Sequence, residues 1–220
     1  MMEKEEKKEG LVRDLAERVK RGELTPEKAK EEVLKMGVHQ KYEYKYAKSI
    51  GFFVITGGLL CFLPFIAKQT GLKVFSFFTQ LPSITFPSIV IFVVAAVVIF
   101  VNILGWYTPH LRTKKGGTHW EHGTIILIKD GPYAIMRHPG ILALALWFPM
   151  FTIALARGIP FTVLSIIGNI LFFIGINYLT VGEEELNVEK WGDGYRQYQK
   201  EVPRFNFILG IWRWAKRKRK

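Results

Sequence analysis

The chain has 220 residues, a formal net charge of +12 and an apolar fraction of 49%. A chain of this length forms one domain, or one domain with a small appendage. Its single cysteine, Cys61, excludes an intrachain disulfide. The high charge and the high apolar fraction are compatible because they are segregated: residues 49–111 and 131–182 contain no acidic residue.

Residues 1–46 are polar and are predicted to form a helical hairpin. Apolar side chains recur at helical spacing in the first half, at Leu11, Val12, Leu15 and Val19. Gly22 interrupts this pattern, and Thr25-Pro26-Glu27 supplies the N-cap, the first-turn proline and the early acid of a second helix. Such a hairpin is too small to be stable without docking. Two roles stay open for this cytoplasmic extension: self-association or binding of a protein partner, and a merely solvated appendage.

Residues 47–220 are predicted to form a membrane domain. Four apolar stretches approach the roughly 20 residues that cross a bilayer, at residues 49–67, 86–106, 141–155 and 161–181. The third is short and needs extension through Pro139 or a thin local bilayer. We therefore expect an all-α polytopic integral membrane protein with about four transmembrane helices, followed by a cytoplasmic helical segment at residues 183–220.

The basic residues indicate the orientation. Four spans would place all but three of the 31 lysines and arginines on the side of both termini and of the loop 107–139. The exceptions are Lys68, Lys73 and Arg157. The positive-inside rule then predicts that both termini are cytoplasmic. The C-terminal basic run 213–220 lies beside tryptophans, which favours the anionic leaflet of a membrane, and not nucleic acid, as its partner.

Titratable residues flank the last two apolar stretches. Arg137 and His138 precede the third stretch, and Glu183 and Glu184 follow the fourth. Charge beside hydrocarbon is costly, so such residues are candidates for a functional site. Because the third and fourth spans form a hairpin, we expect their cytoplasmic ends to be neighbours. Basic, aromatic and acidic groups would then converge on a ligand that carries both charges and an aromatic base.

These segments belong to a longer pattern. It comprises Gly131-Pro132-Tyr133, Arg137-His138-Pro139, Glu183-Glu184, Trp191-Gly192, Tyr195, Tyr198 and Val202-Pro203-Arg204. Over residues 118–208 the pattern resembles the isoprenylcysteine carboxyl methyltransferase and phospholipid methyltransferase superfamily of integral membrane enzymes. The resemblance implies S-adenosylmethionine as cofactor in a cytosol-facing pocket, and a lipophilic methyl acceptor that enters through the membrane. It requires no metal.

The resemblance also implies roles for individual residues. Cofactor contacts fall on Tyr133, His138, Pro139, Glu183 and Glu184, and on the backbone at the mouth of the pocket, at Ile125, Ile126, Leu127 and Ile128. The two glutamates would pair with the α-ammonium of the cofactor. Arg137 or His138, the predicted catalytic residues, would pair with the carboxylate of the cofactor. Tyr133 would pack on the adenine or shield the sulfonium. An amine acceptor would need a base, for which His138 or a glutamate is the candidate.

Three positions depart from the family pattern. Ile141 and Ala143 stand where the family usually has tyrosine and glycine, and Leu179 stands where the isoprenylcysteine enzymes have an arginine that helps to bind the acceptor. The acceptor therefore stays open between an isoprenylcysteine carboxylate and another lipid or small apolar molecule.

Other readings of the sequence compete with methyl transfer. Sterol-reductase-like membrane enzymes that use NADPH also carry Arg-His-Pro before a late span, but they lack the acidic pair followed by Trp-Gly. A noncatalytic membrane adaptor would use the hairpin 1–46 as its working part. His119 and His122 flank Glu121 at a spacing that would place metal ligands on one helix face. With five histidines in all, the segment is expected to cap the pocket or to lie at the membrane interface instead.

Overall fold

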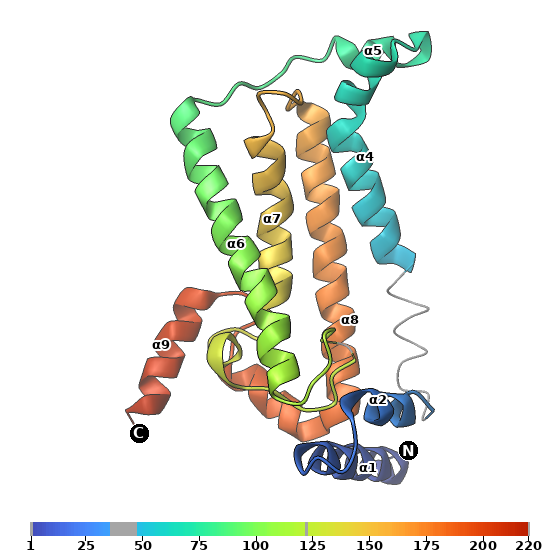
Figure 1. Ribbon diagram of the computed structural model, residues 1–220, viewed down its shortest axis with the longest axis vertical. Helices are drawn as coiled ribbons and strands as arrows, with labels where there is room; N and C mark the ends of the chain where they lie inside the picture. The colour runs from blue at the N-terminus through green and yellow to red at the C-terminus, as the bar shows by residue number, and fades with distance from the viewer. Residues whose placement is uncertain (1, 36–47, 122, 220) are drawn as a thin grey trace. The chain divides into compact units, whose positions relative to one another are not determined.

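The structure is a computed structural model that describes residues 2–35, 48–121 and 123–219, and these residues form helices and loops without a strand (Figure 1). The chain divides into two compact units. Unit 1 comprises Met1–Tyr46, Gly105–Leu142 and Thr180–Lys220, and unit 2 comprises Ala47–Leu104 and Ala143–Leu179. All of the candidate site described below lies in unit 1.

The N-terminal part of unit 1 is a pair of helices, α1 (Met2–Lys20) and α2 (Pro26–Lys35). Gly22 separates them with a φ of 76°, a left-handed conformation that favours glycine. Their apolar faces are buried at Val12, Leu15, Val19, Ala29 and Val33. The loop 115–130 covers part of this apolar surface, since a Cβ on Gly116 would lie 3.5 Å from Val19. The pair is therefore docked, as a hairpin of this size requires.

Three helices are long and apolar enough to cross a membrane. They are α4 (Lys48–Thr70), α6 (Ser88–Lys114) and α8 (Val163–Glu201). A fourth apolar helix, α7 (Pro139–Ala154), has 16 residues and is shorter. It begins at Pro139, which suits the first turn of a helix because proline has no amide hydrogen to leave unpaired. The short helices η2 (Lys73–Phe75) and α5 (Ser76–Thr79) lie between α4 and α6 in the chain.

Small residues bring α4 and α8 together in unit 2. A Cβ added to Gly57 would lie 2.5 Å from the carbonyl oxygen of Gly168, and a Cβ on Gly168 would lie 2.4 Å from that of Gly57. Such close backbone approach is typical of helix packing in membranes. Phe148 of α7 and Phe172 of α8 stack with ring centroids 4.3 Å apart. Large apolar side chains remain exposed on α4 and α6, as expected of helices that face lipid, among them Phe52, Ile55, Phe92 and Phe100.

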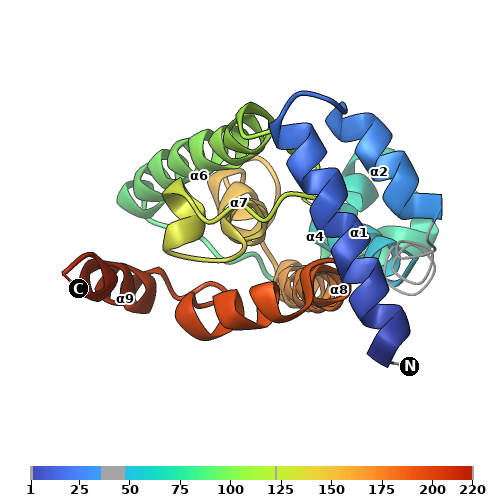
Figure 2. The same cartoon turned by 90° about the horizontal axis from the view of Figure 1, so that it is seen from below.

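The long helix α8 is interrupted at Gly192, whose φ of 45° and ψ of −125° are not helical. Figure 2 shows the segment after this bend turning away from the axis of the preceding part. Only the first part of α8, up to Val181, is apolar; the rest carries the acidic and aromatic residues of unit 1. The last helix, α9 (Phe207–Lys218), starts at Asn206, whose Oδ1 accepts a hydrogen bond of 3.0 Å from the amide of Leu209.

Candidate functional site

The turn at residues 131–139 and the acidic pair of α8 meet in unit 1. The turn contains the short helix η3 (Gly131–Ala134) and ends where α7 begins. His138 Nδ1 lies 3.5 Å from Glu183 Oε2, and His138 Nε2 lies 3.3 Å from Glu184 Oε1. His138 is fully buried, and both glutamates are nearly so. Segments 45 residues apart in the sequence thus form one buried polar cluster.

Arg137 fixes the turn to α8 and to the segment that follows it. Its Nε and Nη2 donate hydrogen bonds of 2.8 and 2.7 Å to Glu184 Oε1. Its Nη1 donates to the carbonyl oxygens of Gln199 and Val202. Arg204 Nη2 donates to the other oxygen of Glu184. The guanidinium of Arg137 thus holds the turn to Glu184 and to the backbone of residues 199 and 202; the catalytic role that the sequence predicts for it stays a prediction.

His138 is the centre of the cluster. Besides the two glutamates of α8, its Nδ1 lies 3.0 Å from Glu121 Oε1 in the loop 115–130. Burial lowers the pKa of His138, but attraction to Glu121 and contacts with Glu183 and Glu184 raise it by more, so the pKa lies well above its ordinary value. Burial raises the pKa of Glu121, but the positive charge of His138, assisted by Arg112 and Lys190, lowers it on balance. These shifts favour the protonated form of His138 and the ionised form of Glu121.

This ionisation predicts how stability depends on pH. The contribution of His138 is complete below the unfolded pKa of about 6.5 and is lost as the pH rises through the raised folded value. The contribution of Glu121 is present above its unfolded pKa and is lost as the pH falls through the lowered folded value. Relative to His138→Gln, the wild type should show a fall in Tm on the alkaline side when thermal unfolding in detergent is followed from about pH 6 to about pH 10. Burial lowers the pKa of Lys190 to about 7, so Lys190 contributes the opposite trend in both proteins, and the comparison isolates His138. His110→Gln, at an exposed ring stacked on Trp106, is the matched control and should keep the fall. An equal fall in His138→Gln would contradict the assignment.

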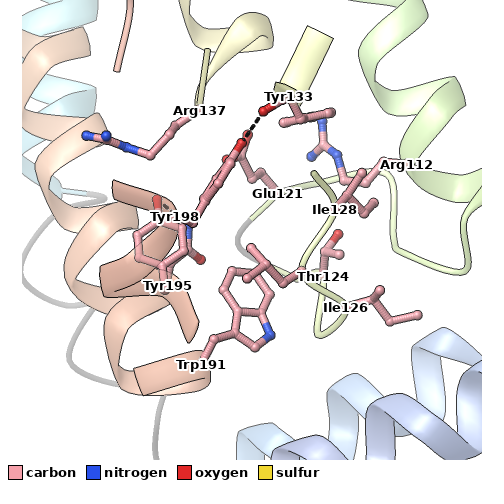
Figure 3. A pocket seen from close by; sticks show the side chains of 12 residues that line it. Arg112, Glu121, Thr124, Ile126, Ile128, Tyr133, Arg137, Trp191, Tyr195 and Tyr198 are labelled. Carbon is pink, nitrogen blue, oxygen red and sulfur yellow. Dashed lines mark hydrogen bonds between the residues drawn. The ribbon is translucent and has the colours of Figure 1, made fainter. Parts of the chain in front are cut away.

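A small cavity lies between the loop 115–130, the turn and α8 (Figure 3). Its volume is about 20 Å³, room for about one water molecule. Aromatic rings and two guanidinium groups form much of its wall, and the complete lining is Arg112, Glu121, Thr124, Ile126, Leu127, Ile128, Tyr133, Arg137, Asn187, Trp191, Tyr195 and Tyr198. Tyr198 Oη donates a hydrogen bond of 2.6 Å to the carbonyl oxygen of Tyr133, which closes the cavity on the side of the turn. A molecule the size of a nucleotide enters only if the loop moves outward.

Buried polar atoms without a hydrogen-bond partner concentrate in this cluster. Among the described residues there are six such side-chain atoms. Five belong to the cluster: Arg112 Nε, Tyr133 Oη, His138 Nδ1, Glu183 Oε2 and Asn187 Oδ1. Burial raises the pKa of Tyr133, and nearby Arg112 offsets only part of that rise. The carboxylates approach His138, but none of these contacts has good hydrogen-bond geometry. Buried groups of this kind cost free energy unless a ligand or water satisfies them.

Two side chains of α8 hold the loop 115–130 in place. Lys190, which is 1% exposed, donates a hydrogen bond of 2.8 Å from Nζ to the carbonyl oxygen of Thr124. Trp191 Nε1 donates one of 2.6 Å to the carbonyl oxygen of Ile125. The Lys190 ammonium also lies 4.3 Å from the ring centroid of Trp191. Because α8 binds the carbonyl oxygens of Thr124 and Ile125, it fixes the part of the loop that brings Glu121 next to His138.

The predicted site residues divide into three groups. Ile126, Leu127, Ile128, Tyr133 and Arg137 line the cavity, whereas His138, Glu183 and Glu184 are buried beside it. Pro139 begins α7, and Ile125 lies behind the cavity with its carbonyl bonded to Trp191.

The segment around His119 is a loop. The described residues between 115 and 130 are not helical, and His122 lies outside the described residues. Gly116, with a φ of 84°, and Gly117 directly after it break the helix before it reaches His119. The spacing that would place His119 and His122 on one helix face therefore loses its basis.

Four cluster residues escaped the sequence analysis: Arg112, Asn187, Lys190 and, as an ionised partner of His138, Glu121. Each lies in a polar segment without apolar periodicity, where exposure is the default expectation. A charged side chain next to glycines and aromatic residues, as in residues 187–195, is the only signal that could have indicated their burial.

Glu121, His138 and Glu183 offer ligand atoms within 4.8 Å of one another. Two carboxylates and an imidazole can bind a divalent cation. Here the pKa of the imidazole lies well above its ordinary value, Arg112 lies near Glu121, and Lys190, whose pKa burial lowers to about 7, lies there as well. These charges favour an ion-pair network over a metal site, and the sequence-based expectation of no metal stays a prediction.

A second, larger cavity of about 210 Å³ lies beside the first. The two share Ile126, Leu127 and Trp191. The far wall comes from α1, through Val12, Arg13, Ala16 and Lys20. The N-terminal hairpin therefore stands behind the loop that closes the candidate site.

Comparisons with family models, with curated proteins and with solved structures found no match to this chain.

Proposed function

We propose that this chain is a membrane enzyme that transfers a methyl group from S-adenosylmethionine to a lipophilic acceptor. The observation that carries the proposal is the meeting of Glu183 with the turn 131–139, at 3.5 Å from His138. The sequence motifs that resemble the membrane methyltransferases are the same residues that form this buried cluster. Three apolar helices of membrane length in the same chain are consistent with an acceptor that reaches the site from lipid.

The chemistry of the cluster fits the cofactor. Glu183 and Glu121 supply carboxylates for an ammonium group, and Arg112 supplies a guanidinium for a carboxylate. The rings of Tyr133, Tyr195 and Tyr198 offer faces to an adenine or to a positive sulfur. Several of these groups have polar atoms without a protein partner. When bound, the cofactor supplies an electrophilic methyl group; the chain orients it and excludes water.

The protonation state of His138 affects which chemical class of methyl acceptor the site would suit. A protonated imidazole cannot take a proton from an amine, but it can donate a hydrogen bond to an anion. His138 therefore favours an acceptor that is already deprotonated, such as a carboxylate, which needs no base.

The membrane topology is part of the proposal. We assign α7, despite its 16 residues, as a fourth span beside the three long helices, with local thinning of the bilayer or extension at its ends. Both termini are then cytoplasmic by the distribution of basic residues, and the candidate site faces the cytosol.

Titration of the purified protein with S-adenosylmethionine and, separately, with NADPH tests the function. Saturable binding of S-adenosylmethionine, measured calorimetrically in detergent, is the expected result, with no binding of NADPH. Binding of NADPH alone would favour a reductase, and binding of neither would favour a noncatalytic adaptor. Incubating the protein with a total lipid extract and methyl-labelled cofactor would then identify the acceptor by its label.

A further inference from the structure

Helix α9 presents an apolar face that the rest of the described chain does not cover. Phe207, Ile208, Ile211 and Trp212 are between 48 and 70% exposed. The last turn of the same helix carries Lys216, Arg217 and Lys218. Exposed apolar side chains next to a basic cluster are the signature of a helix that lies in the surface of an anionic membrane. The same chain has three helices that are long and apolar enough to cross a membrane, so a membrane surface is a consistent partner for α9.

A cavity of about 250 Å³ lies beside the basic end of α9. Its lining is Lys129, Ala134, Tyr198, Glu201, Val202, Trp214, Arg217 and Lys218. Three cations against one carboxylate suit an anionic group such as a phospholipid phosphate. Tyr198 lines both this cavity and the small cavity of the candidate site. The cavity beside the basic end of α9 and the cavity of the candidate site therefore share the side chain of Tyr198 as part of their walls.

α9 is packed tightly against the turn 131–139. A Cβ added to Gly210 would lie 1.9 Å from the carbonyl oxygen of Ile135, so only glycine allows this approach. Arg217 Nη2 donates a hydrogen bond of 2.7 Å to the carbonyl oxygen of Ala134. Both contacts reach the backbone of the turn directly before Arg137 and His138.

The segment that leads into α9 holds the next residues of the turn. The amide of Arg137 donates to the carbonyl oxygen of Pro203 at 3.0 Å, and the amide of His138 donates to that of Arg204 at 3.4 Å. A displacement of α9 therefore acts on the backbone of the two residues that organise the candidate site.

We infer that α9 couples binding of an anionic membrane surface to the order of the candidate site. With α9 bound in the lipid surface, the turn 131–139 is held against residues 203–204; with α9 released, the turn loosens. The inference concerns the site's order and does not depend on methyl transfer.

The test compares the full-length protein in nanodiscs of zwitterionic lipid and in nanodiscs that contain anionic phosphatidylglycerol. An environment-sensitive fluorophore on Ile208→Cys, in a Cys61→Ala background, reports insertion of α9. Amide hydrogen exchange at residues 135–138 reports the turn. In anionic discs the fluorophore should move to a less polar environment, and exchange at the turn should slow by about fivefold or more.

Three variants separate insertion from coupling. Ile211→Asp, on the exposed face, should abolish both responses to anionic lipid. Leu11→Asp, at a similarly exposed apolar residue of α1, is the matched control and should keep both. Gly210→Ala should keep insertion but lose the slowing of exchange, because its Cβ forces α9 away from Ile135.

The inference is overturned if exchange at the turn is equal in the two kinds of disc, or if Ile211→Asp still shows the slowing. Soluble glycerol phosphate, added to zwitterionic discs, distinguishes a membrane surface from a free phosphate. Slowing of exchange by the soluble phosphate alone would overturn the membrane as the partner.

Discussion

Replacing Arg137 by methionine should lower the free energy of unfolding of unit 1 by about 3–5 kcal/mol, the usual cost of removing one partner of a buried ion pair. Arg137 and Glu184 are each less than a tenth exposed, and their hydrogen bonds are 2.7 and 2.8 Å long. Without the guanidinium, the Glu184 carboxylate and the carbonyl oxygens of Gln199 and Val202 stay buried with fewer donors. Chemical denaturation in detergent micelles, followed by tryptophan fluorescence, measures the change.

Two further variants decide whether this loss belongs to the ion pair. Arg137→Lys keeps the charge but cannot reach all three acceptors at once, so it should fall between the wild type and Arg137→Met. The double variant Arg137→Met with Glu184→Leu should be more stable than Arg137→Met alone, because no buried carboxylate remains unpaired. Arg196→Met is the control, since Arg196 is exposed and bonds only to exposed Asp193, and it should change stability by less than about 1 kcal/mol. Additive effects at Arg137 and Glu184 would contradict the interpretation.

Replacing Glu183 by glutamine should weaken binding of S-adenosylmethionine by about 1.5–3 kcal/mol, roughly 10-fold to 150-fold in Kd. Glu183 is 5% exposed, and its Oε2 has no hydrogen-bond partner in the protein. Burial, together with the charge of Glu121, raises the pKa of Glu183, and the ammonium of a bound cofactor would favour its ionised form. A glutamine of the same size keeps the packing but cannot carry that charge. Calorimetric titration of wild type and variant measures the difference.

Glu185→Gln is the matched control, because Glu185 is exposed and only two residues away, and it should leave Kd within about twofold. Unchanged affinity in Glu183→Gln, with clear binding by the wild type, would remove Glu183 from the cofactor site. A variant that has lost its cooperative thermal transition would have lost its fold, so the transition is measured alongside the affinity.

Much of the architecture could be predicted from local pattern. The apolar runs before Lys68 and after Ser88 carry no charged residue over a length that could cross a membrane, so helices of membrane-spanning length follow from composition. Pro139 marks the start of α7 because its chemistry is specific to the first helical turn. The contact between His138 and Glu183 could be expected because adjacent apolar helices bring their ends together, and the two side chains do meet.

The rest of the cluster depends on tertiary packing that no local pattern encodes. Lys190 lies in a polar segment and is nevertheless buried, with its Nζ bonded to the carbonyl oxygen of Thr124 in a loop distant in sequence. Glu121 reaches His138 because glycines turn the loop 115–130 back toward α8, where helical spacing had suggested a different use for its histidine neighbours. The helix α8 also continues beyond the apolar run that ends at Val181. From the sequence, this polar continuation is expected to be a separate cytoplasmic helical segment.

The candidate site has two facing walls, and the bend at Gly192 shapes the one that α8 provides. Glu183 and Glu184 precede the bend and Tyr195 and Tyr198 follow it, so a single piece of chain, clamped by Arg137, presents both carboxylates and rings. The opposite wall is the loop around Glu121, which α8 holds through the hydrogen bonds from Lys190 and Trp191. Behind this loop lies the cavity of about 210 Å³ whose far wall is α1, so a ligand that displaced the loop would press it toward the N-terminal hairpin.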